Sequence, residues 1–226
     1  MTPSELTGKS ERHLCPTLVG QKSFLIHQQV SDDLLALKAA ADDAGFVFNI
    51  ASGFRDYQRQ ATIWNNKMSG HSAILDHASQ PLEPSELSEA QKVQAILRWS
   101  ALPGASRHHW GSDFDVFDRR ALPSGETLKL EPWEYLSGHQ HAFYCWLKDN
   151  LNNFGFFFPY QQDLGGVAPE PWHISHYHTA TQCLDALTPE CLAQEIKQMP
   201  YLGSEYVLNH LDSIYTDYIA NIHRER

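Results

Sequence analysis

The 226-residue sequence contains only four cysteines, and no two of them form a C-x-x-C pair. Four are too few to cross-link a chain of this length, so we expect buried free thiols. Positive charge is also scarce, because 17 Lys and Arg stand against 27 Asp and Glu and give a formal net charge of −10. With no block of basic residues, nucleic acid is not an expected partner.

Long apolar runs are absent as well. No stretch approaches the ~18 apolar residues that a membrane-spanning helix needs. The polar segment 1–20 also lacks the apolar core of a secretory signal. We therefore expect no membrane span and a cytoplasmic location, with the periplasm as the alternative. Repeats, low-complexity tracts and flexible linkers are missing too, which predicts a single domain over residues 1–226.

What is present is the composition of a folded globular protein, with 42% apolar and 19% charged residues. An apolar stripe behind the capping residue Ser31 predicts a helix that Gly45 ends. Further helices are expected at 55–68, from Ser85, at 139–153, and twice between 188 and 226. Strands are expected at 46–50, 113–118, 156–160 and 172–177. This uneven mixture predicts an α+β fold.

The first chemically informative segment is 106–115, with the sequence SRHHWGSDFD. Its last residue, Asp115, lies within an apolar strand. A carboxylate there is costly to bury unless it is paired or binds a metal. His108, seven residues earlier, is a candidate partner.

The second segment is 170–173, with the sequence EPWH. Prolines follow both Ala168 and Glu170, so both residues are restricted to extended backbone, which fixes how the glutamate is presented. Together, His108, Asp115 and His173 would make a three-ligand zinc site with its fourth position open. A nearby non-ligand glutamate could then act as general base. The alternative from spacing alone is a buried Asp115 hydrogen-bonded to a histidine.

The pattern S-x-H-x-x-G-x-x-x-D, followed by E-x-W-H, resembles the motifs of VanY-type D-alanyl-D-alanine carboxypeptidases. Upstream, S-G-F-R at 52–55 with Gln60 is similar to the family's S-G-[YF]-R-x-x-x-x-Q segment. These are zinc peptidases of bacterial peptidoglycan with a hedgehog-like fold. The resemblance therefore implies a small, mostly antiparallel sheet that carries the zinc site and is packed with helices. The motifs span 52–173, so the helices beyond about residue 180 are extra.

The resemblance also implies roles for individual residues. One zinc per chain would be bound by His108, Asp115 and His173, with Glu170 as general base. Arg55 would polarise the scissile carbonyl or hold the substrate. Further substrate contacts are expected from Gln60, Ser106 and Trp172.

The expected function is therefore hydrolysis of a D-Ala-D-Ala-like terminal bond in a peptidoglycan-derived peptide. The alternatives are a peptidoglycan endopeptidase or an L,D-carboxypeptidase of the same fold, and a non-catalytic module that binds cell-wall peptides. The presence of Glu170 favours an enzyme. Nothing in the sequence indicates the oligomeric state.

Five neighbouring residues carry secondary expectations. Trp110, inside the first motif, is expected with Trp172 at the pocket wall. Asp113 and Asp118 are candidate hydrogen-bond partners of a metal-binding histidine. His176, like His178, should lie on the strand face opposite His173 because side chains alternate along a strand.

Overall fold

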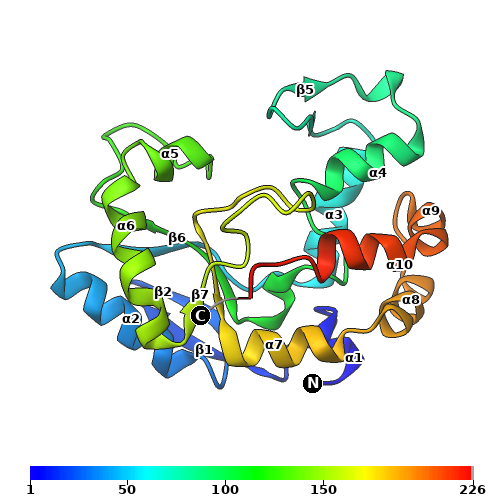
Figure 1. The fold of residues 1–226 in the computed structure, drawn as a ribbon. Helices are drawn as coiled ribbons and strands as arrows, with labels where there is room; N and C mark the ends of the chain where they lie inside the picture. Colours follow the sequence, from blue (N-terminus) through cyan, green and yellow to red (C-terminus); the bar gives the residue numbers. More distant parts are fainter. Residues whose placement is uncertain (225–226) are drawn as a thin grey trace.

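The computed structural model describes residues 1–224, which form an α+β fold around a four-stranded sheet (Figure 1). The strand order is β3-β6-β8-β7, and every neighbouring pair is antiparallel. The strands are β3 (Phe48–Ser52), β6 (Asp113–Asp118), β8 (His173–His176) and β7 (Phe156–Phe157). The predicted fold class, with its small antiparallel sheet, is confirmed.

Two hairpins accompany this sheet. The first joins β1 (Leu14–Val19) to β2 (Lys22–His27), and the second joins β4 (Ile74–Leu75) to β5 (Pro81–Leu82). Figure 1 shows α5 and the β4–β5 hairpin on opposite sides of the molecule, with the loop before β8 between them.

Helices account for most of the remaining ordered backbone. In the first half of the chain they are α1 (Pro3–Leu6), α2 (Ser31–Asp43), α3 (Tyr57–Met68), η1 (Pro84–Glu86), α4 (Glu89–Leu97) and η2 (Arg107–Trp110). In the second half they are α5 (Pro132–Leu136), α6 (His141–Asn150), η3 (Leu151–Phe154), α7 (Tyr177–Ala186), α8 (Pro189–Gln198), α9 (Ser204–Asn209), α10 (Leu211–Ile214) and η4 (Tyr215–Ile219). Within residues 1–224, no helix combines the length and apolar character needed to cross a bilayer.

The apolar side chains form two clusters. One joins the sheet to α2 and α6, and the other joins α3 and α4 to α7 and the C-terminal helices. Strand β6 belongs to the first cluster through Phe114 and Val116. Because side chains alternate along a strand, Asp113 and Asp115 point to the opposite face. The alternation over residues 113–116 thus places Phe114 and Val116 in the core and Asp113 and Asp115 at the site.

Gly111 joins η2 to β6 at a point where no other residue fits. Its φ is +66°, and a Cβ there would lie 2.4 Å from Leu14 Cδ2 and 3.0 Å from the His27 backbone nitrogen. The Gly111 carbonyl accepts a hydrogen bond from that nitrogen at 2.9 Å. This turn fixes the position of His108 relative to Asp115.

Several predicted boundaries and contacts differ from the structure. Helix α2 begins at Ser31, but Ser31 does not cap it, and its hydroxyl bonds Thr17 at 2.9 Å instead. Helix α3 begins two residues after Arg55, where the Asp56 carboxylate caps it. Between residues 188 and 224 the chain forms three α-helices rather than two, and the β1–β2 hairpin was not predicted. All four cysteines are free, as expected, but only Cys183 is buried.

Candidate metal centre and active-site cleft

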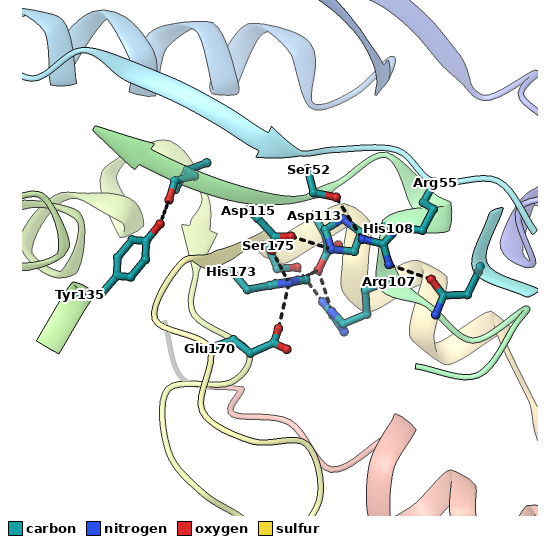
Figure 2. A network of polar contacts seen from close by, with 12 residues as sticks. Ser52, Arg55, Arg107, His108, Asp113, Asp115, Tyr135, Glu170, His173 and Ser175 are labelled. Atoms are coloured by element: carbon teal, nitrogen blue, oxygen red, sulfur yellow. Dashed lines mark hydrogen bonds and ion pairs between the residues drawn. The ribbon is translucent and has the colours of Figure 1, made fainter. Parts of the chain in front are cut away.

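Three buried side chains from different elements converge beside the sheet (Figure 2). His108 comes from η2, Asp115 from β6 and His173 from β8, where Asp115 and His173 are paired across the two strands. One potential ligand atom from each of them lies within 4.8 Å of the others. Asp115 Oδ2 is 3.4 Å from His108 Nε2, and Asp115 Oδ1 is 3.2 Å from His173 Nδ1.

The positions of these atoms are more consistent with binding a common metal ion than with hydrogen bonds to one another. Asp115 Oδ1 and His173 Nδ1 are buried and make no hydrogen bond within the described chain, although they face each other. Leaving such atoms unsatisfied is costly. Around a tetrahedral zinc with bonds of about 2.0–2.1 Å, ligand atoms lie roughly 3.3 Å apart, which matches both separations. Two imidazoles and one carboxylate are also a donor set that zinc accepts.

The electrostatics of the cluster favour an anionic Asp115. Burial opposes ionisation of this carboxyl, but the close imidazoles of His108 and His173 hold its pKa well below the usual value. Burial also disfavours a charged His173, yet the hydrogen bond with Asp113 and the nearby carboxylates of Asp115 and Glu170 raise its pKa well above the usual value. The pocket therefore stabilises positive charge between its carboxylates.

A polar network behind the cluster fixes His173. Its Nε2 lies 3.1 Å from Asp113 Oδ1, which also accepts a hydrogen bond from Arg107 Nε at 2.7 Å. Ser112 Oγ donates to the other Asp113 oxygen at 2.7 Å, and Arg107 Nη2 donates to Ser175 Oγ at 2.6 Å. With Nε2 engaged by Asp113, the Nδ1 atom of His173 faces Asp115. Asp113 thus contacts a cluster histidine, as suggested from sequence.

Asp118, the other candidate partner, lies elsewhere. Its carboxylate accepts hydrogen bonds from the backbone nitrogens of Val47 and Arg120, both at 2.9 Å. It therefore ties β6 to the neighbouring loops.

Glu170 lies beside the cluster on the loop that precedes β8. Its Oε2 is 3.4 Å from His173 Nδ1, and 17% of its side chain is exposed. The backbone of Glu170 is held on both sides, because its nitrogen donates to the Tyr160 carbonyl at 2.9 Å and its carbonyl accepts from His173 at 3.0 Å. The carboxylate is accordingly positioned by backbone but accessible from the cavity.

Arg55 is held at the same cavity. Its Nη1 donates to Gln60 Oε1 at 2.7 Å, and its Nη2 donates to Ser52 Oγ at 3.0 Å. Burial lowers the pKa of the guanidinium, while the charges of Asp115 and Glu170 oppose that shift. Gln60 itself is buried behind Arg55 and donates to the Ala101 carbonyl at 2.7 Å. Gln60 therefore contacts the arginine in the structure.

A cavity of about 320 Å³ connects these groups. Its inner part is lined by Arg55, Ser106, His108, Asp115, Glu170, Trp172 and His173. Its outer part is lined by residues from α3, from the β4–β5 loop and from the segment before α5, among them Lys67, Ser79, Lys129 and Leu130. A cavity of about 460 Å³ beside α4 contains none of the cluster residues.

Trp172 lines this cavity, but the expectation for Trp110 was wrong. Trp110 is fully buried, and its Nε1 donates to the Leu6 carbonyl at 3.1 Å. It anchors the N-terminal helix instead of facing the cavity. His176 lies apart from the cluster, with Nε2 3.0 Å from Asp33 Oδ2. His178 is in α7, beside Gln182.

Comparison with known families agrees with this geometry. The model of the family VanY, D-alanyl-D-alanine carboxypeptidase, matches residues 23–179. The chain belongs to the VanY family. The match includes all three segments from which the resemblance was inferred. The small antiparallel sheet carries two of the three clustered side chains, Asp115 and His173, and η2 carries His108.

Individual relatives match different shares of the chain. An uncharacterized protein of Haemophilus influenzae is 40% identical over 122 residues, which cover 53% of this chain and 93% of the relative. A D-alanyl-D-alanine carboxypeptidase of Enterococcus faecalis is 27% identical over 151 residues, and the match spans 47% of that protein. The solved structure of a vancomycin resistance D,D-pentapeptidase VanY in complex with Zn(II) shares the fold, at 24% identity and a TM-score of 0.51. That alignment covers 88% of this chain and 92% of the other.

Proposed function

We propose that this VanY-family chain is a zinc-dependent peptidase that hydrolyses a D-Ala-D-Ala-like terminal bond of a peptidoglycan peptide. The observation that carries the proposal is the unsatisfied pair Asp115 Oδ1 and His173 Nδ1, which face each other beside Glu170 and Arg55. The zinc-complexed relative and the family's carboxypeptidase members support the same assignment.

His108, Asp115 and His173 would hold the metal. When bound, zinc lowers the pKa of a coordinated water to about 7 and polarises a carbonyl. Glu170 Oε2 would take the proton of the attacking water and return it to the leaving amine nitrogen. The loop geometry supports this role, because the Glu170 backbone is hydrogen-bonded while its carboxylate stays accessible.

Arg55 would bind the terminal carboxylate of the peptide or stabilise the developing oxyanion. Its planar fork of donors suits either group, and its hydrogen bonds to Ser52 and Gln60 fix its orientation before substrate arrives. Ser106 and Trp172 line the inner cavity and would contact the peptide. Gln60 would contribute by holding Arg55.

We also propose that residues 1–226 act as one domain. The C-terminal helices α8 to α10 support this, because their apolar residues pack in the same cluster as α3 and α4.

The proposal is tested by comparing Glu170→Gln with the wild type on a peptide that ends in D-Ala-D-Ala. The variant should retain about one zinc per chain but release D-Ala on the order of 10²–10⁴-fold more slowly, because an amide cannot accept the proton. Glu11→Gln, at an exposed position outside the cavity, is the matched control and should behave as wild type. Full activity in Glu170→Gln would refute the assignment of Glu170 as general base. Loss of zinc in this variant would indicate that Glu170 is a metal ligand.

A further inference from the structure

The outer part of this cavity contains a cation, Lys67, that has no partner among residues 1–224. Lys67, in the last turn of α3, lines the same cavity as Arg55 and Glu170. Its side chain is partly buried, and within residues 1–224 it makes no hydrogen bond or ion pair. Burial lowers the pKa of its ammonium group, and no nearby carboxylate opposes that shift. A partly desolvated ammonium group gains free energy when an anion approaches it.

The charges around Lys67 do not supply that anion. Of the cavity's carboxylates, Asp115 belongs to the metal cluster and Glu170 lies beside His173. Glu131 forms no ion pair with Lys67 within residues 1–224, and no carboxylate counters the effect of burial on the Lys67 pKa. The lining nevertheless contains four Lys and Arg against three Asp and Glu, although the whole chain has a net charge of −10. The cavity is therefore locally more favourable to anions than the rest of the surface.

The spacing along α3 shows which part of a peptide would reach Lys67. Gln60, which holds Arg55, and Lys67 are seven residues apart, so they share a helix face. At 1.5 Å per residue, their backbones are separated by about 10 Å along the axis. An extended peptide advances ~3.3 Å per residue, so this distance corresponds to about three residues.

We propose that Lys67 binds a side-chain carboxylate on the third residue from the C-terminus of the peptide. The substrate class is then an acidic peptide with a free C-terminus. This inference rests on the proposed function, since Arg55 at the terminal carboxylate sets the register. Lys67 determines specificity, whereas the inner residues carry the chemistry.

The test compares two peptides of equal shape, acetyl-L-Glu-D-Ala-D-Ala and acetyl-L-Gln-D-Ala-D-Ala. The wild type should cleave the glutamate peptide with a kcat/KM roughly tenfold higher, as one charge-assisted contact would give. Added salt should reduce this preference. In Lys67→Met the ratio should fall to about one, and Lys67→Arg should restore part of it. Lys129→Met, which removes another cation from the lining of the same cavity, is the matched control and should keep the preference.

Binding of both peptides to Glu170→Gln, measured by calorimetry, separates this inference from the proposed function. If Glu170→Gln binds the glutamate peptide more tightly but the wild type cleaves neither peptide, the proposed peptidase activity is refuted and the Lys67 site is supported. Equal kcat/KM or equal binding for the two peptides would overturn the Lys67 site alone, and so would failure of both to bind. Loss of the preference in Lys129→Met but not in Lys67→Met would also overturn it.

Discussion

Asp113→Asn tests whether the carboxylate behind His173 tunes the metal site. Asp113 is fully buried, and its Oδ1 is 3.1 Å from His173 Nε2. The charge of the carboxylate favours a proton on Nε2, which leaves Nδ1 as the basic nitrogen that faces Asp115. An asparagine keeps the shape and can present an oxygen, but it removes the charge.

Two effects of different size follow from this change. Loss of a carboxylate partner behind a metal-binding histidine typically weakens metal binding by about 10–100-fold, or roughly 1.4–2.8 kcal/mol. Arg107 also loses its ion-pair partner at 2.7 Å, and breaking a buried pair costs about 3–5 kcal/mol of folding free energy. The second effect lowers the stability of the metal-free protein, so zinc affinity and unfolding must be measured separately.

The assay is zinc titration against a chromophoric chelator, with denaturant unfolding of the metal-free protein alongside. Asp118→Asn is the matched control, because Asp118 is buried on the same strand and, within residues 1–224, its carboxylate accepts hydrogen bonds only from backbone nitrogens. Both variants should lose stability, but only Asp113→Asn should lose zinc affinity. An unchanged zinc dissociation constant in Asp113→Asn would refute the reasoning.

Three further predictions follow from other features. Gly111→Ala should destabilise the fold by more than about 2 kcal/mol and reduce zinc retention, because of its φ of +66° and a Cβ 2.4 Å from Leu14. Gly125 has a φ of +82° but no atom near the position of a Cβ, so Gly125→Ala should lower the free energy of unfolding by only about 1 kcal/mol. Equal losses of unfolding free energy in the two variants, measured by denaturant unfolding, would contradict this. Burial lowers the pKa of His109 to about 3 and of His27 to about 4, from 6.5. The unfolded chain therefore binds more protons as pH falls below about 6.5, so the free energy of unfolding should fall between about pH 6.5 and 4. His109→Gln should reduce that slope, and an identical slope would exclude His109 as a contributor. Finally, if Arg55 binds the terminal carboxylate, amidation of the peptide C-terminus should slow cleavage strongly, as should Arg55→Lys. Equal cleavage of acid and amide would favour an endopeptidase.

The sequence by itself was sufficient to predict the fold class and strand β6 and to name the candidate metal ligands. Strand β6 was predicted at 113–118 and lies there, because its alternation and its flanking glycine are local signals. His108 and Asp115 share one short motif, so the turn at Gly111 brings them together by local geometry. The β1–β2 hairpin was missed because β2 is exposed at its start and buried at its end, which leaves no alternation to detect.

The tertiary structure decided which residues act on one another across the chain. Asp113 and His173 are 60 residues apart, and only the register of β6 against β8 places them in contact. The same holds for Lys67, which looks like a surface residue in its helix until the cavity is formed. Trp110 follows the motif histidines, yet packing against the N-terminal helix takes it into the core. Motifs specify side-chain chemistry and local spacing, whereas orientation, burial and pairing depend on strand register and packing, which a single segment does not encode.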